Sequence, residues 1–175
     1  MPAKFRTKSY IADSYYHLFN RGVEKRVIFM DEQDYAVFLS YIKTYLLVKD
    51  TEGLQKIILN EQSSWKQKHD AARLLRLNNF SDSLTLVSYC LMPNHFHLLV
   101  HQKNADTIDR FMNSLCTRYS MYFNKKYHRV GPLFQGLYKA VSVLTDEQLL
   151  HLTRYIHRNP ASKGRALQSY AYSSY

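Results

Sequence analysis

The sequence predicts an α+β domain: a four-stranded antiparallel sheet with helices on one face and a further helix near the carboxyl end. Segments 15–20 and 84–92 are rich in strand formers, and segment 94–100 alternates between apolar residues and histidines. Two longer segments repeat apolar residues at helical spacing. The resulting order is strand, helix, strand, strand, helix, strand, helix, which is typical of the ferredoxin-like or RRM-like arrangement.

The first half of the chain provides one strand and one helix of this sheet. The strand covers residues 15–20 and ends at the turn formed by Arg21 and Gly22. The helix covers residues 31–48, with Asp31 suited to the N-cap position and an apolar stripe along one face. Residues 49–82 are mostly polar, with scattered apolar positions. We interpret them as an inserted, partly helical excursion.

The middle of the chain predicts a strand hairpin followed by a long helix. The hairpin strands cover residues 84–92 and 94–100, and Pro93 with Asn94 marks the turn between them. The helix covers residues 106–126 and carries apolar residues on one face. Alternation sends the two histidines of the second strand to one face and Phe96 to the other.

The last predicted elements are a strand over residues 133–144 and a helix. The helix begins with a capping box, in which Thr145 is the N-cap and Gln148 is the N3 residue. We expect it to end at Asn159, because a proline at 160 disfavours helical geometry in the residue before it. Residues 161–175 form a basic, tyrosine-rich tail, and 1–175 is expected to be a single domain.

Charge is concentrated in the carboxyl-terminal part of the chain. The formal net charge is +10, and residues 110–175 hold 10 Lys and Arg against only Asp146 and Glu147. Such a one-sided positive field attracts polyanions and accelerates their encounter. The 15 Tyr and 9 Phe could also stack on unpaired bases, although many of them must belong to the core. Composition therefore favours a nucleic-acid partner over a basic surface that serves solubility alone.

Other features favour a cytoplasmic setting and no membrane partner. The apolar runs are far too short to span a bilayer, and the basic amino-terminal stretch lacks the apolar segment of a signal peptide. The two cysteines, Cys90 and Cys116, have neither a metal-binding nor a disulfide-like spacing.

The first chemical feature is His95-Phe96-His97 on the alternating strand. Both imidazoles are expected on one face, with their Cα atoms roughly 7 Å apart. Two imidazoles at this separation can bind one divalent ion and leave positions for water or phosphate oxygen. A His-x-His pair without other support is more often simply two half-exposed polar residues.

The second chemical feature is one face of the last helix. His151, Tyr155 and Asn159 are each four residues apart and therefore share a face. The packing stripe consists of apolar residues elsewhere on the helix, Leu149, Leu152 and Ile156. A tyrosine that only packs its ring, with the hydroxyl bonded to a neighbour, is the alternative for Tyr155.

Together the two features fit phosphoryl transfer. A phenol with a pKa near ~10 is a weak nucleophile at neutral pH, and a nearby cation favours its phenolate form. The same cation would neutralise a scissile phosphate and hold it for attack. The product would be a phosphotyrosine ester, which keeps the cut strand ready for rejoining. A simple hydrolase has no need of the tyrosine.

Several motifs, in this order and spacing, resemble a known family. The strongest are SYCLMPNHFHLLV (88–100) and RYIHRNP (154–160). Further matches cover 16–22, 29–39, 118–141 and 170–175, which leaves 49–82 as the segment outside the pattern. The chain resembles the REP-associated branch of the single-tyrosine HUH transposases.

The resemblance implies an enzyme that cleaves and transfers single-stranded, hairpin-bearing DNA. In it, His95 and His97 match the pair that binds a divalent cation, usually Mg²⁺ or Mn²⁺. Tyr155 matches the nucleophile that leaves a 5′-phosphotyrosine and a free 3′-OH. Asn159 matches the position that can complete the metal site. Relatives of this kind recognise short, imperfectly paired DNA hairpins, so the implied partner is DNA of the bacterial nucleoid.

Six cations are the candidate phosphate contacts, each of which could instead be an ordinary solvated charge. They are Arg21, Lys139, Arg154, Arg158, Lys163 and Arg165. His157 is omitted from the metal set, because it faces away from Tyr155 on an ideal helix. Both a monomer and a homodimer are compatible with the sequence.

Two other functions remain open at this point. The first is a non-catalytic nucleic-acid-binding module of RRM-like fold, although the sequence has no good copy of the aromatic signature of such modules. The second is a small metallohydrolase that uses His95 and His97, which lacks an evident third ligand and carboxylate base.

Overall fold

The computed structural model describes residues 10–161 and 170–174. Its elements in chain order are β1 (Ser14–Arg21), η1 (Val23–Lys25), α1 (Glu32–Leu46), α2 (Thr51–Leu59), α3 (Trp65–Arg76), β2 (Leu84–Met92), β3 (His95–Gln102), α4 (Thr107–Lys126), β4 (Lys139–Val143) and α5 (Asp146–Arg158). Every strand and helix expected from the sequence is present, although β4 is much shorter than predicted.

The four strands form one sheet in the order β2-β3-β1-β4, and each neighbouring pair is antiparallel. This is the strand order of the ferredoxin-like arrangement, so the predicted fold class is confirmed. The two central strands, β1 and β3, come from distant parts of the chain. Their register sets Phe19 opposite His97 and Arg21 opposite His95.

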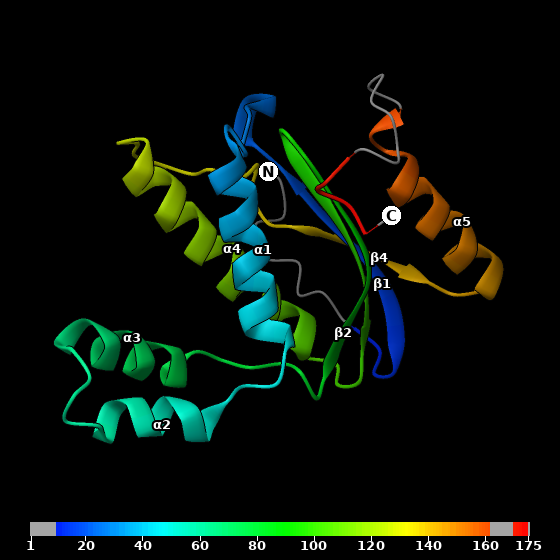
Figure 1. Ribbon diagram of the computed structural model, residues 1–175. Helices are drawn as coiled ribbons and strands as arrows, with labels where there is room; N and C mark the ends of the chain where they lie inside the picture. The colour runs from blue at the N-terminus through cyan, green and yellow to red at the C-terminus, as the bar shows by residue number, and fades with distance from the viewer. Residues whose placement is uncertain (1–9, 162–169, 175) are drawn as a thin grey trace.

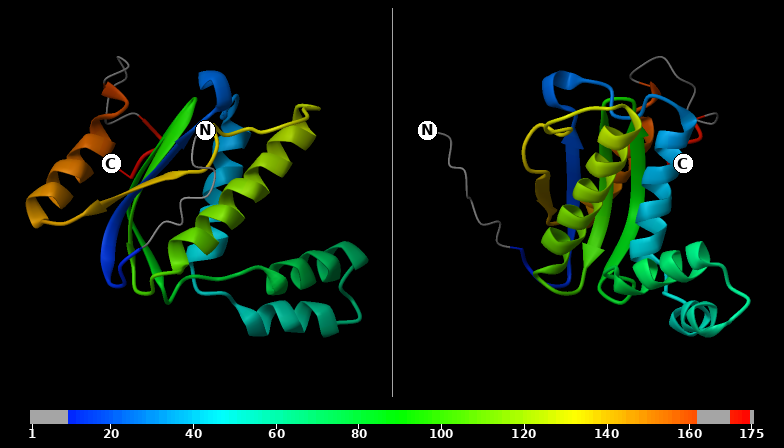
Figure 2. Two further views of the ribbon diagram at one scale, coloured as in Figure 1. Left: turned by 180° about the vertical axis from the view of Figure 1, so that it is seen from behind. Right: turned by 90° about the vertical axis from the view of Figure 1, so that its left-hand side faces the viewer.

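Helices cover both faces of the sheet (Figures 1 and 2). On one face, α1 and α4 enclose the main core, which includes Phe96, Leu98 and Val100 of β3. On the other face, α5 packs Ile156 against Leu99 in a smaller core. Because β3 contributes alternate residues to the two cores, the predicted alternation along this strand is confirmed.

Asp34 ties the start of α1 to the end of α4. Its side chain is completely buried. The carboxylate accepts hydrogen bonds from the Met30 amide at 2.8 Å, the Tyr122 hydroxyl at 3.0 Å, the Lys126 ammonium at 2.8 Å and the Tyr127 hydroxyl at 2.8 Å. A buried carboxylate is tolerated only when its oxygens are paired in this way. The network therefore fixes the two core helices relative to each other.

Residues 49–82, expected as an excursion, form the helical hairpin α2–α3. A capping box starts α3: Ser64 accepts from the Gln67 amide, and the Gln67 side chain accepts from the Ser64 amide. The hairpin projects from one end of the domain, away from α5 (Figure 1). Trp65 lies largely in solvent on this hairpin. None of the helices within residues 10–161 or 170–174 combines the length and apolarity that crossing a membrane requires.

The strand predicted over residues 133–144 is wrong in extent, because only Lys139–Val143 pairs as β4. The apolar residues before it pack into the main core from an irregular segment, as Leu133, Phe134 and Tyr138 do. Gly136 interrupts the extended chain with φ +70°, a value that suits glycine. Their apolar character therefore reflects core packing and not strand pairing.

The start of α5 agrees with the sequence, whereas the reason given for its end is wrong. Thr145 accepts from the Gln148 amide at 3.2 Å, and Gln148 accepts from the Leu144 amide at 2.9 Å. Asn159 caps the helix and keeps helical dihedrals, φ −51° and ψ −43°. Pro160 therefore does not force its neighbour out of the helical region, and Asn159 stays in line with the preceding turn.

The end of the chain protects the outer edge of β2. The Leu91 amide donates to Tyr172 at 2.9 Å, and the Ser174 amide donates to Tyr89 at 3.0 Å. The Tyr172 ring also stacks on Tyr35, with centroids 3.7 Å apart. Exposed strand edges invite pairing with other chains, so this segment blunts one edge of the sheet.

We expect Asp34→Ala to lower the free energy of unfolding by about 3 kcal/mol, because it removes the buried acceptor of two tyrosine hydroxyls and one of the two carboxylates that pair with Lys126. Chemical denaturation of the purified protein measures this. The matched control is Glu32→Gln, an exposed change in the same helical turn, which should leave the midpoint nearly unchanged. Equal midpoints for Asp34→Ala and wild type would show that the network does not stabilise the fold.

Candidate active site

Strand β3 brings His95 and His97 to the face of the sheet that α5 covers. Their ring centroids are 5.0 Å apart, and the ring planes are perpendicular. His97 is buried, at 7% exposure, whereas His95 is partly exposed. The alternation of strand residues accounts for this shared face, since the intervening Phe96 enters the opposite core.

Helix α5 brings Tyr155 to the same place. Its ring centroid lies 5.8 Å from that of His97, with the rings edge to face. The side chain is 50% exposed, so the ring is not locked in the interior. Ile156, the next residue, anchors the helix in the smaller core. The packing of Ile156 thus places Tyr155 beside the imidazoles.

The three side chains share a cavity of about 470 Å³. The cavity is lined by residues from β1, β3, β4, α5 and the connecting turns: Phe19, Asn20, Arg21, Lys25, Asn94, His95, His97, Gln135, Lys139 and Tyr155. Three of these residues are cations, and none of the described lining residues is Asp or Glu. A concave surface with one sign of charge concentrates ions of the opposite sign. The cavity therefore suits an anion such as a phosphate.

A tight turn holds Arg21 at this cavity. The Gly22 amide donates to Asn94 at 2.9 Å, and the amides of Ile28 and Phe29 donate to Pro93 at 2.7 and 3.0 Å. A Cβ on Gly22 would lie 2.3 Å from the Arg26 carbonyl oxygen, so only glycine allows this approach. The turn after β1 is thereby fastened to the β2–β3 turn.

A third histidine, not identified from the sequence, lies directly behind the pair. His17 of β1 is buried, and its Nε2 is 2.8 Å from Nδ1 of His97. Burial lowers the pKa of His17 to about 4. Burial, with His17 and His95 as neighbours, lowers the pKa of His97 to about 3. Both rings are therefore neutral at neutral pH.

The two imidazoles of His95 and His97 have a geometry that fits a divalent cation. Two imidazoles on one ion place their centroids about 5 Å apart for metal–nitrogen bonds of about 2.1 Å, which the observed 5.0 Å matches. Nδ1 of His95 is 2.7 Å from the Asn94 side-chain oxygen, so Nε2 is the nitrogen for an ion. The described residues hold no group of three or more His, Cys, Asp or Glu arranged for a metal. Among the described residues, any further ligand of such an ion would therefore come from amide, water or phosphate oxygens.

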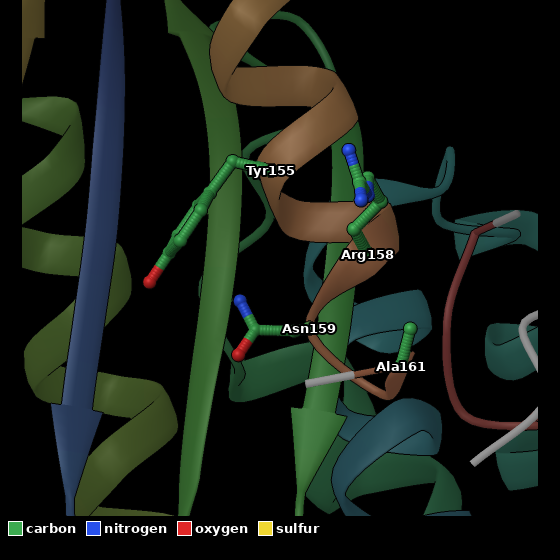
Figure 3. A pocket seen from close by; sticks show the side chains of 4 residues that line it. All are labelled: Tyr155, Arg158, Asn159 and Ala161. Carbon is green, nitrogen blue, oxygen red and sulfur yellow. The ribbon is translucent and has the colours of Figure 1, made fainter. Parts of the chain in front are cut away.

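Asn159 lies one turn beyond Tyr155 and is buried at 9% exposure. Both side chains point to the same side of α5, whereas Arg158 points another way (Figure 3). Tyr155, Arg158, Asn159 and Ala161 line a second cavity of about 490 Å³. Because Tyr155 lines both cavities, Asn159 adjoins the histidine cavity at the tyrosine without lining it.

The remaining candidates differ in their position. Arg154 and Arg158 are exposed on α5 and line a groove of about 250 Å³ with His151 and Tyr155. His157 contacts the carboxyl-terminal segment, with Nε2 3.0 Å from the Ser174 hydroxyl oxygen. Lys163 and Arg165 lie outside the described residues.

Comparison with known proteins identifies the family. A family model described as "Transposase IS200 like" matches residues 58–159. The chain belongs to this family of IS200-like transposases. The matched region contains both histidines and the tyrosine. No curated protein matches the chain.

Two solved structures are similar to this IS200-like transposase. A REP-associated tyrosine transposase bound to a REP hairpin is 12% identical, with a TM-score of 0.52 over 98% of this chain and 82% of that one. A transposase of Deinococcus radiodurans, described as putative, is 18% identical, with a TM-score of 0.39 over 88% of this chain and 96% of that one. The first likeness supports the fold. Family membership indicates a transposase-like function on DNA.

We expect Arg21→Gln and Lys139→Gln each to weaken binding to DNA. If each cation contacts one phosphate, the slope of log affinity against log salt should fall by about 1 per variant. Fluorescence anisotropy over a salt series measures this. Lys43→Gln, an exposed change on α1, is the matched control. An unchanged slope in both cavity variants would contradict their contact with phosphate.

Proposed function

We propose that this IS200-like transposase cleaves and rejoins single-stranded, hairpin-bearing DNA through a 5′-phosphotyrosine at Tyr155, in a reaction that depends on a divalent metal. One observation carries the proposal: Tyr155, His95 and His97 line the same cavity, among three cations. A binding protein has no need to bring a half-exposed phenol beside two imidazoles. A nuclease that forms a covalent tyrosine ester needs both.

The chemical step is a displacement at phosphorus. The Oη atom of Tyr155 attacks the scissile phosphate, and a bond forms between Oη and phosphorus. The bond from phosphorus to the 3′ oxygen breaks, and that oxygen takes up a proton as the 3′-OH. The phenolic proton passes to water. In the reverse sense, a 3′-OH attacks the phosphotyrosine, restores the phosphodiester and releases Tyr155, which is strand transfer.

We assign His95 and His97 as the metal ligands and Asn159 as the residue that completes the site through its amide oxygen. The ion, Mg²⁺ or Mn²⁺, would withdraw charge from the phosphate and favour the phenolate. Arg21 and Lys139 are proposed to hold the phosphates nearest the site. Arg154, Arg158, Lys163 and Arg165 are assigned to the DNA that flanks it.

The assignment of hairpin DNA as partner is supported by the bound REP hairpin of the structural relative. Within one chain, the Tyr155 ring already lies 5.8 Å from His97. We therefore propose that a monomer holds a complete site and that 1–175 acts as one domain on DNA in the cytoplasm. Since α2–α3 projects away from α5, this excursion is not assigned to the chemistry.

The alternatives receive less support. An RRM-like module stacks bases on an open sheet face, but here α5 and Tyr170 pack over the β2 and β3 half of that face. A metallohydrolase needs a carboxylate base, and among the described residues none that lines the histidine cavity is acidic.

We expect Tyr155→Phe to abolish both cleavage and the covalent adduct while hairpin binding persists, because the change removes the nucleophilic oxygen and keeps the ring. Incubation of a labelled hairpin-bearing strand with Mn²⁺, followed by denaturing electrophoresis, measures both products. Tyr15→Phe, another partly exposed tyrosine on the sheet, is the control and should cut normally. Adduct formation by Tyr155→Phe would overturn the proposed function.

His95→Ala and His97→Ala should each reduce the cleavage rate on the order of 10³-fold, since several kcal/mol of metal stabilisation are lost. Binding should survive in both, because phosphate contacts elsewhere supply much of the affinity. Wild-type protein treated with EDTA should likewise lose cleavage and retain binding. Cleavage that persists in EDTA would refute the metal requirement.

A further inference from the structure

His17 is a buried imidazole beside this site, and the proposed reaction gives it no role. It comes from β1, whereas His97 comes from β3, and Nε2 of His17 is 2.8 Å from Nδ1 of His97. The centroids of the two rings are 5.0 Å apart, and the ring planes are inclined by only 22°. Phe19 packs against His17 from the same strand, at 4.8 Å between centroids. Packing therefore fixes the orientation of the His17 ring.

A hydrogen bond between two imidazole nitrogens contains a single N–H, so it has two possible arrangements. If Nδ1 of His97 donates, Nε2 of His97 carries a lone pair and can bind a metal. If Nε2 of His17 donates, the hydrogen of His97 resides on its Nε2, and that nitrogen cannot bind. The choice made within the buried pair thus determines what His97 offers to the cavity.

The neighbouring ligand indicates which arrangement serves the site. Nδ1 of His95 lies 2.7 Å from the side-chain oxygen of Asn94. An amide oxygen only accepts, so Nδ1 of His95 is the donor and Nε2 is the metal-binding nitrogen. His17 therefore occupies the same position relative to His97 that Asn94 occupies relative to His95: each lies within hydrogen-bond distance of Nδ1. Both rings are held at Nδ1 by a neighbour, which is how protein metal sites orient their imidazoles.

We propose that His17 is a positioning residue that accepts the Nδ1 hydrogen of His97 and so turns Nε2 of His97 toward a divalent cation shared with His95. This inference rests on the proposed metal-dependent function. An apolar ring in its place would fill the same space but would leave the buried Nδ1 of His97 without an acceptor. The polar ring is therefore explained by its bond to His97.

The test compares His17→Phe with His17→Gln in the full chain. Phenylalanine keeps the ring but has no acceptor, whereas the glutamine amide oxygen reaches a similar point and can accept the same hydrogen. The probe is Mn²⁺ alone, without DNA, and free Mn²⁺ is followed by electron paramagnetic resonance. We expect His17→Phe to weaken Mn²⁺ binding roughly 10–100-fold and His17→Gln to restore most of the affinity.

Nitrogen NMR of the wild-type protein provides a second readout that needs neither metal nor cleavage. We expect His97 to carry its hydrogen on Nδ1 in the wild type and in His17→Gln, and to lose this preference in His17→Phe. Melting temperatures of the three proteins separate loss of fold from loss of orientation. If His17→Phe does not fold, the wild-type tautomer and the affinity of His17→Gln still decide the question.

Several results would overturn the inference. One is equal Mn²⁺ affinity in the wild type and in a folded His17→Phe. Another is a wild-type His97 that carries its hydrogen on Nε2. A third is Mn²⁺ affinity of His17→Gln that is as low as that of His17→Phe. Absence of Mn²⁺ binding in the wild type would overturn it together with the metal assignment. Failure of the proposed function appears separately, as cleavage by Tyr155→Phe.

Discussion

The register between β1 and β3 is the constraint on which the site depends. It sets Phe19 opposite His97 and Arg21 opposite His95, and it brings His17 within bonding distance of His97. A slip by one residue would send the imidazoles to the opposite face, into the core beneath α1 and α4. The apolar residues that alternate with them cannot leave that core, so burial of Phe96 and its neighbours specifies the register of the polar side chains.

The chemistry also requires that both faces of the sheet be covered. One face carries the core that stabilises the domain, and the other receives α5 through a much smaller cluster around Ile156 and Leu99. Because that second contact covers β2 and β3, the ring of Tyr155 meets His97 at the margin of the helix and remains half in solvent. Under the proposed function, a nucleophile at this margin would be near the imidazoles and accessible to a long polymer.

Local periodicity was sufficient to predict which side chains share a face, and insufficient where contacts are long-range. The pairing of His95 with His97 follows from strand alternation, and that of Tyr155 with Asn159 follows from helical spacing. His17 could not be found this way, since 80 positions separate it from His97 and no local periodicity relates the two residues. The predicted length of β4 was wrong for a similar reason. Leu133 and Phe134 are apolar because they fill the core from a loop, and in sequence such a loop has the same apolar character as a strand.

Charge explains how DNA would strengthen the binding of an ion at such a site. Imidazoles and an amide oxygen are neutral ligands, and among the described residues that line the cavity there is no carboxylate, whereas Arg21, Lys25 and Lys139 are positive. Under the proposed function, a divalent ion would add to this charge, and the protein has nothing in the cavity to balance it. The phosphodiester supplies the missing negative charge and the missing oxygen ligands together. Under the proposed function, ion and DNA would therefore stabilise each other in the cavity, and by linkage each would raise the affinity for the other.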